Sequence, residues 1–201
     1  MTSNEIREPV QQRSIEKKQN IIKEGFNLIC SYGYHNINTA QIAKAAGVST
    51  GIIYNYFEDK HDILLAGIEM YTEELFFPLL NIDTDFKFKK SELKDVLIDM
   101  LDSLLKHHKV SKKAHEEIMA MSHSDKDVAR HFNKLEIQMS SNITSLLLNN
   151  KINPVNLEEK VHIIIGLMEN LCHEVLYHKH KELDFDVMKD LTVNAIMNIL
   201  K

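Results

Sequence analysis

The chain has 201 residues, of which 44% are hydrophobic and 26% are charged, and its formal net charge is -5. This composition excludes a disordered chain and provides enough apolar material for one or two small domains. With six Gly and three Pro, the chain has too few turn residues for an all-β fold of many strands. Because Leu, Ile, Lys, Glu and Met are abundant, we expect an all-α protein.

Sorting and redox signals point to a reducing compartment. The polar stretch 1–12 has no apolar segment of the kind found in signal peptides, and no apolar run is long enough to span a bilayer. We therefore expect a cytoplasmic protein with no membrane partner. Cys30 and Cys172 lie far apart within helical patterns, so reduced, buried thiols are expected rather than a disulfide.

The first quarter of the chain predicts short helices and tight turns, because most of the glycines fall there. Apolar residues at helical spacing predict a helix over 14–31, with Gly33 as its stop. Asn38 followed by Gln41 resembles a capping box, which predicts a second, short helix that ends at Gly47.

A third helix is predicted over 50–56. The hydroxyls of Ser49 and Thr50 are expected to cap it, and Ile53 and Phe57 would form its buried side. Helices this short are not stable alone, so the three must share one small core.

Longer helices are predicted in the rest of the chain. Asp59 is expected to cap a fourth helix that Pro78 stops. Five more are predicted over 89–109, 111–122, 125–150, 157–180 and 185–200, giving about nine in all. Two of these starts carry pairs that resemble capping boxes, Ser124 with Asp127 and Asn156 with Glu159.

Two short helices joined by a glycine turn have the spacing of a helix-turn-helix. A recognition helix needs small residues at its N-terminus, so that its backbone can approach the duplex. It also needs outward hydrogen-bonding side chains that reach phosphates and base edges. Both are present in the set Ser49, Thr50, Gly51, Tyr54, Asn55 and Tyr56.

The charge of this region gives little support for nucleic-acid binding. Residues 1–62 hold seven Lys and Arg against seven Asp and Glu, so the segment is neutral overall. Its weak positive footprint comes from Arg13, Lys17, Lys18 and Lys60.

Several motifs with their spacing resemble the TetR family of transcriptional regulators. They are Gly33-Tyr34, Thr39-Ala40-Gln41-Ile42-Ala43, Ala46-Gly47-Val48-Ser49-Thr50-Gly51, Ile53-Tyr54-Asn55-Tyr56-Phe57 and Lys60. The resemblance covers roughly residues 15–65. It implies an all-α homodimer with a helix-turn-helix DNA-binding domain over 1–62. A helical-bundle domain over 63–201 would bind a small effector and dimerise.

The resemblance implies DNA contacts at Thr39, Ser49, Thr50, Gly51, Tyr54, Asn55, Tyr56 and Lys60. Thr39, Tyr54, Tyr56 and Lys60 are expected to contact phosphates, and Thr50, Ile52 and Asn55 to read bases. Ile52 would contact a thymine methyl group.

Plainer interpretations stay open for several of these residues. Tyr54 and Tyr56 could pack in the core, and Thr39 could be a helix cap. Lys60 could be an ordinary surface charge, and Ile52 could be tucked against the first helix.

The helix predicted over 157–180 carries two apolar stripes, and both must be buried. One would face its own domain and the other, together with the last helix, a second copy, which predicts a four-helix dimer interface. Methionines such as Met100 and Met168 would line a cavity for an apolar or amphipathic effector, or be ordinary core. No effector-binding residue is assigned.

The histidines suggest a metal site that the spacing does not support. The stretch from His173 to His178 misses the zinc motif H-E-x-x-H by one residue. On an α-helix, residues five apart diverge by about 140°, so one metal ion cannot easily take both side chains. Histidines that follow a carboxylate by four residues, such as Glu158/His162 and Glu174/His178, predict surface pairs. We expect no metal and no cofactor, with metal sensing as the open alternative.

The sequence contains no phosphate loop, nucleophile elbow or other assembled catalytic motif, so we expect no enzyme. The expected function is sequence-specific binding of double-stranded operator DNA by a repressor that a small molecule releases. The alternative is a helical adaptor that keeps the helix-turn-helix fold without contacting DNA.

Overall fold

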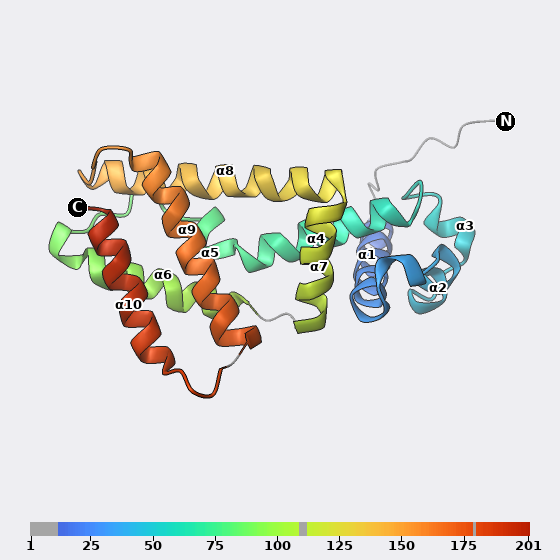
Figure 1. Cartoon of the computed structure of the whole chain (residues 1–201). Helices are drawn as coiled ribbons and strands as arrows, with labels where there is room; N and C mark the ends of the chain where they lie inside the picture. Colours follow the sequence, from blue (N-terminus) through green and yellow to red (C-terminus); the bar gives the residue numbers. More distant parts are fainter. Residues whose placement is uncertain (1–11, 109–111, 179) are drawn as a thin grey trace. The chain divides into compact units, whose positions relative to one another are not determined.

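The computed structural model describes residues 12–108, 112–178 and 180–201, and within them the chain is helical without a β-strand (Figure 1). The predicted all-α fold is confirmed. The helices are α1 (Gln12–Tyr32), α2 (Thr39–Ala45), α3 (Thr50–Ile53), α4 (Lys60–Leu75), α5 (Phe77–Leu80), α6 (Leu93–His107), α7 (Lys112–Ser124), α8 (Lys126–Asn149), α9 (Leu157–His173) and α10 (Phe185–Ile199). A π-helical turn, Glu174–His178, follows α9. None of these helices is both long and apolar enough to cross a membrane.

The described residues form two compact units. The first contains the chain as far as Tyr71 together with α7 and the start of α8, as far as His131. The second contains 72–108 and the chain from Phe132 onward. The functional division expected after Asp62 stays a prediction.

The core of the first unit is shared by its short helices, as predicted. The side chains with almost no exposed surface include Ile21 and Ile29 of α1, Ile42 of α2, Ile53 of α3 and Ile63, Leu64 and Ile68 of α4. Phe57 is also buried. Helices α1 and α4 approach closely at Gly67, where a Cβ atom would lie 2.5 Å from the ring of Phe26.

The capping residues and turn glycines predicted in the first quarter of the chain are confirmed. Asn38 and Gln41 form a capping box, with Gln41 N donating to Asn38 Oδ1 over 3.0 Å and Asn38 N donating to Gln41 Oε1 over 2.8 Å. Gly33 and Gly47 have φ angles of 88° and 67°, which only glycine adopts readily. Asp59 accepts hydrogen bonds from the first amides of α4 as the predicted cap.

The third helix is shorter than predicted and ends at Ile53. Beyond it, Asn55 N donates to the carbonyl of Ile52 and Tyr56 N to that of Ile53. This three-residue spacing tightens the backbone into turns and stops the helix. Ser49 is the N-cap residue, as predicted, but its hydroxyl makes no side-chain capping bond.

Pro78 does not stop the fourth helix. That helix ends at Leu75, and Pro78 lies in the first turn of α5. A proline is tolerated there because amides in a first turn have no partner within the helix.

Neither of the other two predicted pairs forms a capping box, although Asn156 is the N-cap residue of α9, which begins at the predicted residue. The cap of α8 is Asp125, whose Oδ1 accepts from the amides of Asp127 and Val128, whereas Ser124 Oγ donates back to Ala120 O. Asn156 has a φ of 59° and makes no side-chain capping bond. The expected helix limits at 109 and 111 lie outside the described residues.

The second unit buries both predicted stripes of α9 within its own chain. Val161, Ile164, Ile165, Met168, Leu171 and Cys172 are all buried. The prediction that one stripe faces a second copy is therefore wrong for these residues. The large apolar side chains left exposed on α9 and α10 are Ile163, Val187 and Leu191. The α-helical part of the predicted helix 157–180 ends at His173, and a π-helical turn continues it to His178, close to the predicted end.

Candidate nucleic-acid interface

The N-terminal end of α3 is bare, meaning that its residues are exposed. Ser49, Thr50 and Gly51 are exposed. Among the described residues, the nearest atom that a Cβ at Gly51 would meet is Ser49 Oγ, 4.0 Å away. Packing within the unit therefore does not require a glycine at position 51. The absence of a side chain leaves room for a molecule outside the unit to approach the backbone.

Tyr54, expected to contact a phosphate, and Asn55, expected to read a base, come directly after α3. Tyr54 is 45% exposed and Asn55 is exposed, so the core interpretation of Tyr54 is wrong. Ile52 is half-buried, whereas its neighbour Ile53 is fully buried. Ile52 is thus partly available to a ligand and partly packed, which leaves its contact with a thymine methyl group as a prediction.

Tyr56 is held by the first helix. Its Oη lies 2.7 Å from Ser14 Oγ, and Lys18 Nζ lies 5.9 Å from the ring centroid of Phe57. The start of α1 therefore packs against the turn that follows α3. Sequence reasoning missed Ser14, because a hydroxyl in the first turn of a helix carries no signal for a partner 42 residues away.

The turn between α2 and α3 is also supported by α1. Asn20 Nδ2 donates to the carbonyl of Ala46 over 3.0 Å, and Val48 N donates to Ala43 O over 3.0 Å. These bonds fix the backbone on both sides of Gly47, and they orient α3 relative to α2.

Thr39 and Lys60 lie at the opposite end of α2 from this turn. Thr39 is the first residue of α2 and is half-buried, but the cap is Asn38, so the interpretation of Thr39 as a cap is wrong. Lys60 Nζ donates to the carbonyls of Tyr34 and Ile37 over 2.7 and 2.8 Å. It also lies 4.3 Å from the centroid of the Tyr34 ring.

The ammonium group of Lys60 therefore ties the start of α4 to the segment between α1 and α2. Two of its three donors are used inside the protein. A phosphate contact by Lys60 stays a prediction, and it would have to use the remaining donor.

Within the first unit, α7 is joined to Tyr34 and to the end of α1 by two hydrogen bonds. Tyr34 N donates to Glu117 Oε1 over 2.8 Å, and Lys113 Nζ donates to the carbonyl of Ser31. Burial and the charges of Asp59 and Asp125 raise the pKa of the Tyr34 phenol, so this hydroxyl stays protonated at neutral pH.

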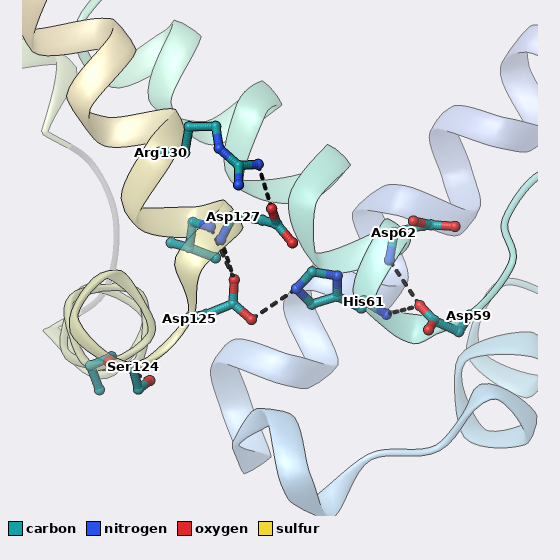
Figure 2. Close-up of polar contacts among 9 residues, drawn as sticks. Asp59, His61, Asp62, Ser124, Asp125, Asp127 and Arg130 are labelled. Atoms are coloured by element: carbon teal, nitrogen blue, oxygen red, sulfur yellow. Dashed lines mark hydrogen bonds and ion pairs between the residues drawn. The ribbon is translucent and has the colours of Figure 1, made fainter.

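The start of α8 is attached to α4 by a second polar cluster (Figure 2). His61 Nε2 lies 2.9 Å from Asp125 Oδ2, and Arg130 Nη1 lies 2.5 Å from Asp127 Oδ1. Burial alone would raise the pKa of Asp125, but hydrogen bonds from the amides of Val128 and Asp127 and from His61 lower it overall. Asp125 is thus ionised at neutral pH.

Residues 21–66 match the family model of bacterial regulatory proteins, tetR family. They form a TetR-family domain. The model describes regulators rather than enzymes, and the matched segment contains α2, α3 and the turn between them. The TetR-family domain thus includes every residue expected at the DNA interface.

The curated relative BetI, an HTH-type transcriptional regulator of Escherichia coli, is 42% identical over 69 residues, which are 34% of this chain and 35% of BetI. The chain spans about a third of the length of the curated relatives that it matches. The sequence likeness to them is therefore confined to one part of each protein.

Solved structures extend the likeness in fold to nearly the whole chain. Salmonella enterica GusR has a TM-score of 0.73 at 14% identity, covering 95% of this chain and 98% of GusR. A candidate transcriptional regulator of Saccharomonospora viridis, solved in complex with choline, has a TM-score of 0.62 at 18% identity, covering 92% and 96% of the two chains. At these identities the likeness is one of fold.

Proposed function

We propose that this chain is a sequence-specific DNA-binding transcriptional regulator that acts as a homodimer in the cytoplasm and represses its target until a small molecule releases it. The observation that carries the proposal is the bare N-terminal end of α3, with Ser49, Thr50 and Gly51 exposed, inside a TetR-family domain. A helix end of this kind can enter the major groove and contact base edges with its backbone close to the duplex.

The proposed contacts fall into two groups. Thr50, Ile52 and Asn55 read bases, while Ser49, Gly51 and Tyr54 lie against the phosphate backbone. Thr39, Tyr56 and Lys60 have half-buried side chains. For Tyr56 and Lys60 we propose that internal hydrogen bonds hold the hydroxyl and ammonium groups in place before DNA arrives.

Dimerisation is part of the proposal because one short helix reads few base pairs. Two recognition helices held about 34 Å apart reach successive turns of the major groove on one face of DNA. Val187 and Leu191 on α10 and Ile163 on α9, each more than half exposed, are the apolar residues that we propose for the interface. Apolar side chains of this size are buried favourably by a second copy.

For the effector we propose a cavity of 340 Å³ in the second unit, lined by Pro78, Ile82, Asp83, Phe86, Val96, Asp99, Met100, Ser103 and Leu146. Its walls are largely apolar, and the carboxylates of Asp83 and Asp99 give it a negative side. This chemistry suits an amphipathic cation. The choline complex of the related fold from Saccharomonospora viridis supports a cation of this kind.

Binding to α5 and α6 residues would act on DNA through α4, whose residues belong to both units. Such coupling is reciprocal, so the effector weakens DNA binding by the same factor by which DNA weakens effector binding.

The test is selection of duplexes from a random library by the purified full chain, followed by titration of the selected duplex at several salt concentrations. A regulator is expected to select a pseudo-palindromic sequence and to lose affinity steeply as salt rises. A helical adaptor, favoured by the neutral charge of residues 1–62, would select nothing.

A further inference from the structure

Three metal-ligating side chains meet just beyond the end of α9. Among the described residues, the ligand atoms of Glu174, His178 and His180 all lie within 4.8 Å of one another. His178 Nδ1 lies 2.8 Å from Glu174 Oε1, and His180 Nε2 lies 3.5 Å from Glu174 Oε2. Both imidazoles thus approach the two oxygens of one carboxylate.

The local backbone produces this arrangement. Glu174 and His178 are four residues apart, so they lie on one side of the π-helical turn that ends at His178. His180 is not helical, and its Nε2 lies 3.5 Å from the second oxygen of the same carboxylate. The spacing that excludes a metal site at His173 and His178 on a regular α-helix therefore does not apply to this different set of ligands.

The three side chains are accessible to an ion from solvent. Their side chains are 22% (Glu174), 51% (His178) and 55% (His180) exposed. The carboxylate of Glu174 is less exposed than either imidazole and is therefore the more fixed of the three ligands. The two more exposed imidazoles can rotate toward an ion bound beside it. In a tetrahedral zinc site adjacent ligand atoms lie about 3.3 Å apart, so modest side-chain rotations bring the set together.

We propose that Glu174, His178 and His180 bind one Zn²⁺ ion. Two imidazoles and one carboxylate with a fourth position left to water form a set that Zn²⁺ adopts in proteins. A ring nitrogen that binds the ion must carry no proton in the complex. The ion would link the end of α9 to the segment that leads to α10.

A second set of possible ligands, His61, Asp125 and Asp127, is less suited to this role. Oδ1 of Asp125 caps α8 and its Oδ2 is bonded to His61. Asp127 is paired with the guanidinium of Arg130 (Figure 2), whose positive charge opposes a cation. This set serves as the internal competitor in the test.

The test is calorimetric titration of the untagged full chain with ZnCl2, together with its melting temperature with and without Zn²⁺. We expect one site per chain and a higher melting temperature in Zn²⁺. His178→Gln and His180→Gln are each expected to weaken Zn²⁺ binding by about tenfold or more. The matched control is His162→Gln, because His162 is an exposed histidine that has one carboxylate partner, Glu136 at 3.5 Å.

The variants separate the possible outcomes. Equal loss in His162→Gln, loss in His61→Gln instead, or unchanged binding in both His178→Gln and His180→Gln would overturn the proposal. So would the absence of any Zn²⁺ binding at neutral pH. Because the readout uses no DNA, its failure would leave the proposed regulatory function unaffected.

Discussion

Nε2 of His61 lies 2.9 Å from Oδ2 of Asp125, which joins the first turn of α4 to the N-cap of α8. The side chains are only 23% and 22% exposed, so water screens the contact incompletely. The carboxylate of Asp125 therefore caps α8 with one oxygen and bonds to His61 of the TetR-family domain with the other.

Replacing Asp125 separates these two tasks. Asp125→Ala is expected to lower the free energy of unfolding by about 1 kcal/mol or more, because it removes both the cap and the bond to His61. Asp125→Asn is expected to lose less, because an asparagine oxygen can still accept from the amides of Asp127 and Val128. Urea denaturation at pH 7 measures both, and equal losses would show that the cap contributes nothing.

The same carboxylate predicts a pH dependence. Its pKa is lower in the folded chain than in the unfolded one, because the amide and His61 hydrogen bonds outweigh burial. Its stabilisation is therefore fully present above the ordinary aspartate pKa of about 4 and is lost as pH falls through the folded value. The difference in unfolding free energy between wild type and Asp125→Asn should shrink on acidification below about pH 4. A difference that grows there would contradict the assignment.

Gly67 is predicted to be intolerant of even one methyl group. In Gly67→Ala the new Cβ would lie 2.5 to 2.7 Å from Phe26 atoms that include its Cβ, and these cannot move without shifting α1. The expected loss is about 1–3 kcal/mol, which outweighs the gain of about 1 kcal/mol in helix propensity. The control is Gly166→Ala, whose Cβ meets no described atom within 4 Å. Thermal melting should show a lower midpoint for Gly67→Ala and no decrease in midpoint for Gly166→Ala.

The features that could be predicted from the sequence are those that neighbouring residues determine. The capping box of Asn38 and Gln41 and the turn at Gly47 depend on side chains within a few residues. The cap of α8 shows the limit of such patterns. Ser124 and Asp125 both have capping side chains, and Asp125, which forms the cap, also bonds to His61, 64 residues away, a contact that no local pattern predicts.

The residues proposed for the interface could be named from the sequence, but the contacts that support them could not. Glu117 reaches Tyr34 across 83 positions of the chain, and no periodic pattern encodes that contact. The same holds for Lys60, which the sequence predicts as a phosphate contact but whose ammonium group donates to internal carbonyls. Long-range packing decides where a flexible side chain points.

Lys60 offers a test between these two roles. Lys60→Met keeps the stem but leaves the half-buried carbonyls of Tyr34 and Ile37 without their donor. We expect a loss of about 1–2 kcal/mol in unfolding free energy. If Lys60 acts only as a phosphate anchor, the melting temperature will be unchanged and only the salt dependence of DNA binding will fall.

The two thiols are predicted to be unreactive in the folded chain. Burial raises the pKa of both Cys30 and Cys172 to about 12, with smaller contributions from the charges of Glu117 and Glu169. The thiolate is the reactive form, so a colorimetric thiol reagent at pH 8 should modify neither quickly. Both should react once the chain is unfolded in guanidinium. Rapid reaction of one equivalent in the native state would show that one unit opens easily.

The central claim is that the bare end of α3 lies against DNA, and Gly51→Ala tests it most directly. The new methyl group would have open space around it within the protein, its nearest described neighbour being Ser49 Oγ at 4.0 Å, so the melting temperature should not fall and should rise slightly through helix propensity. On DNA the same methyl would hinder the close approach of backbone and duplex. Fluorescence anisotropy with the selected duplex at low salt should give an affinity about tenfold weaker than wild type, a difference of about 1.4 kcal/mol. Equal affinities for the folded wild type and variant would contradict the claim.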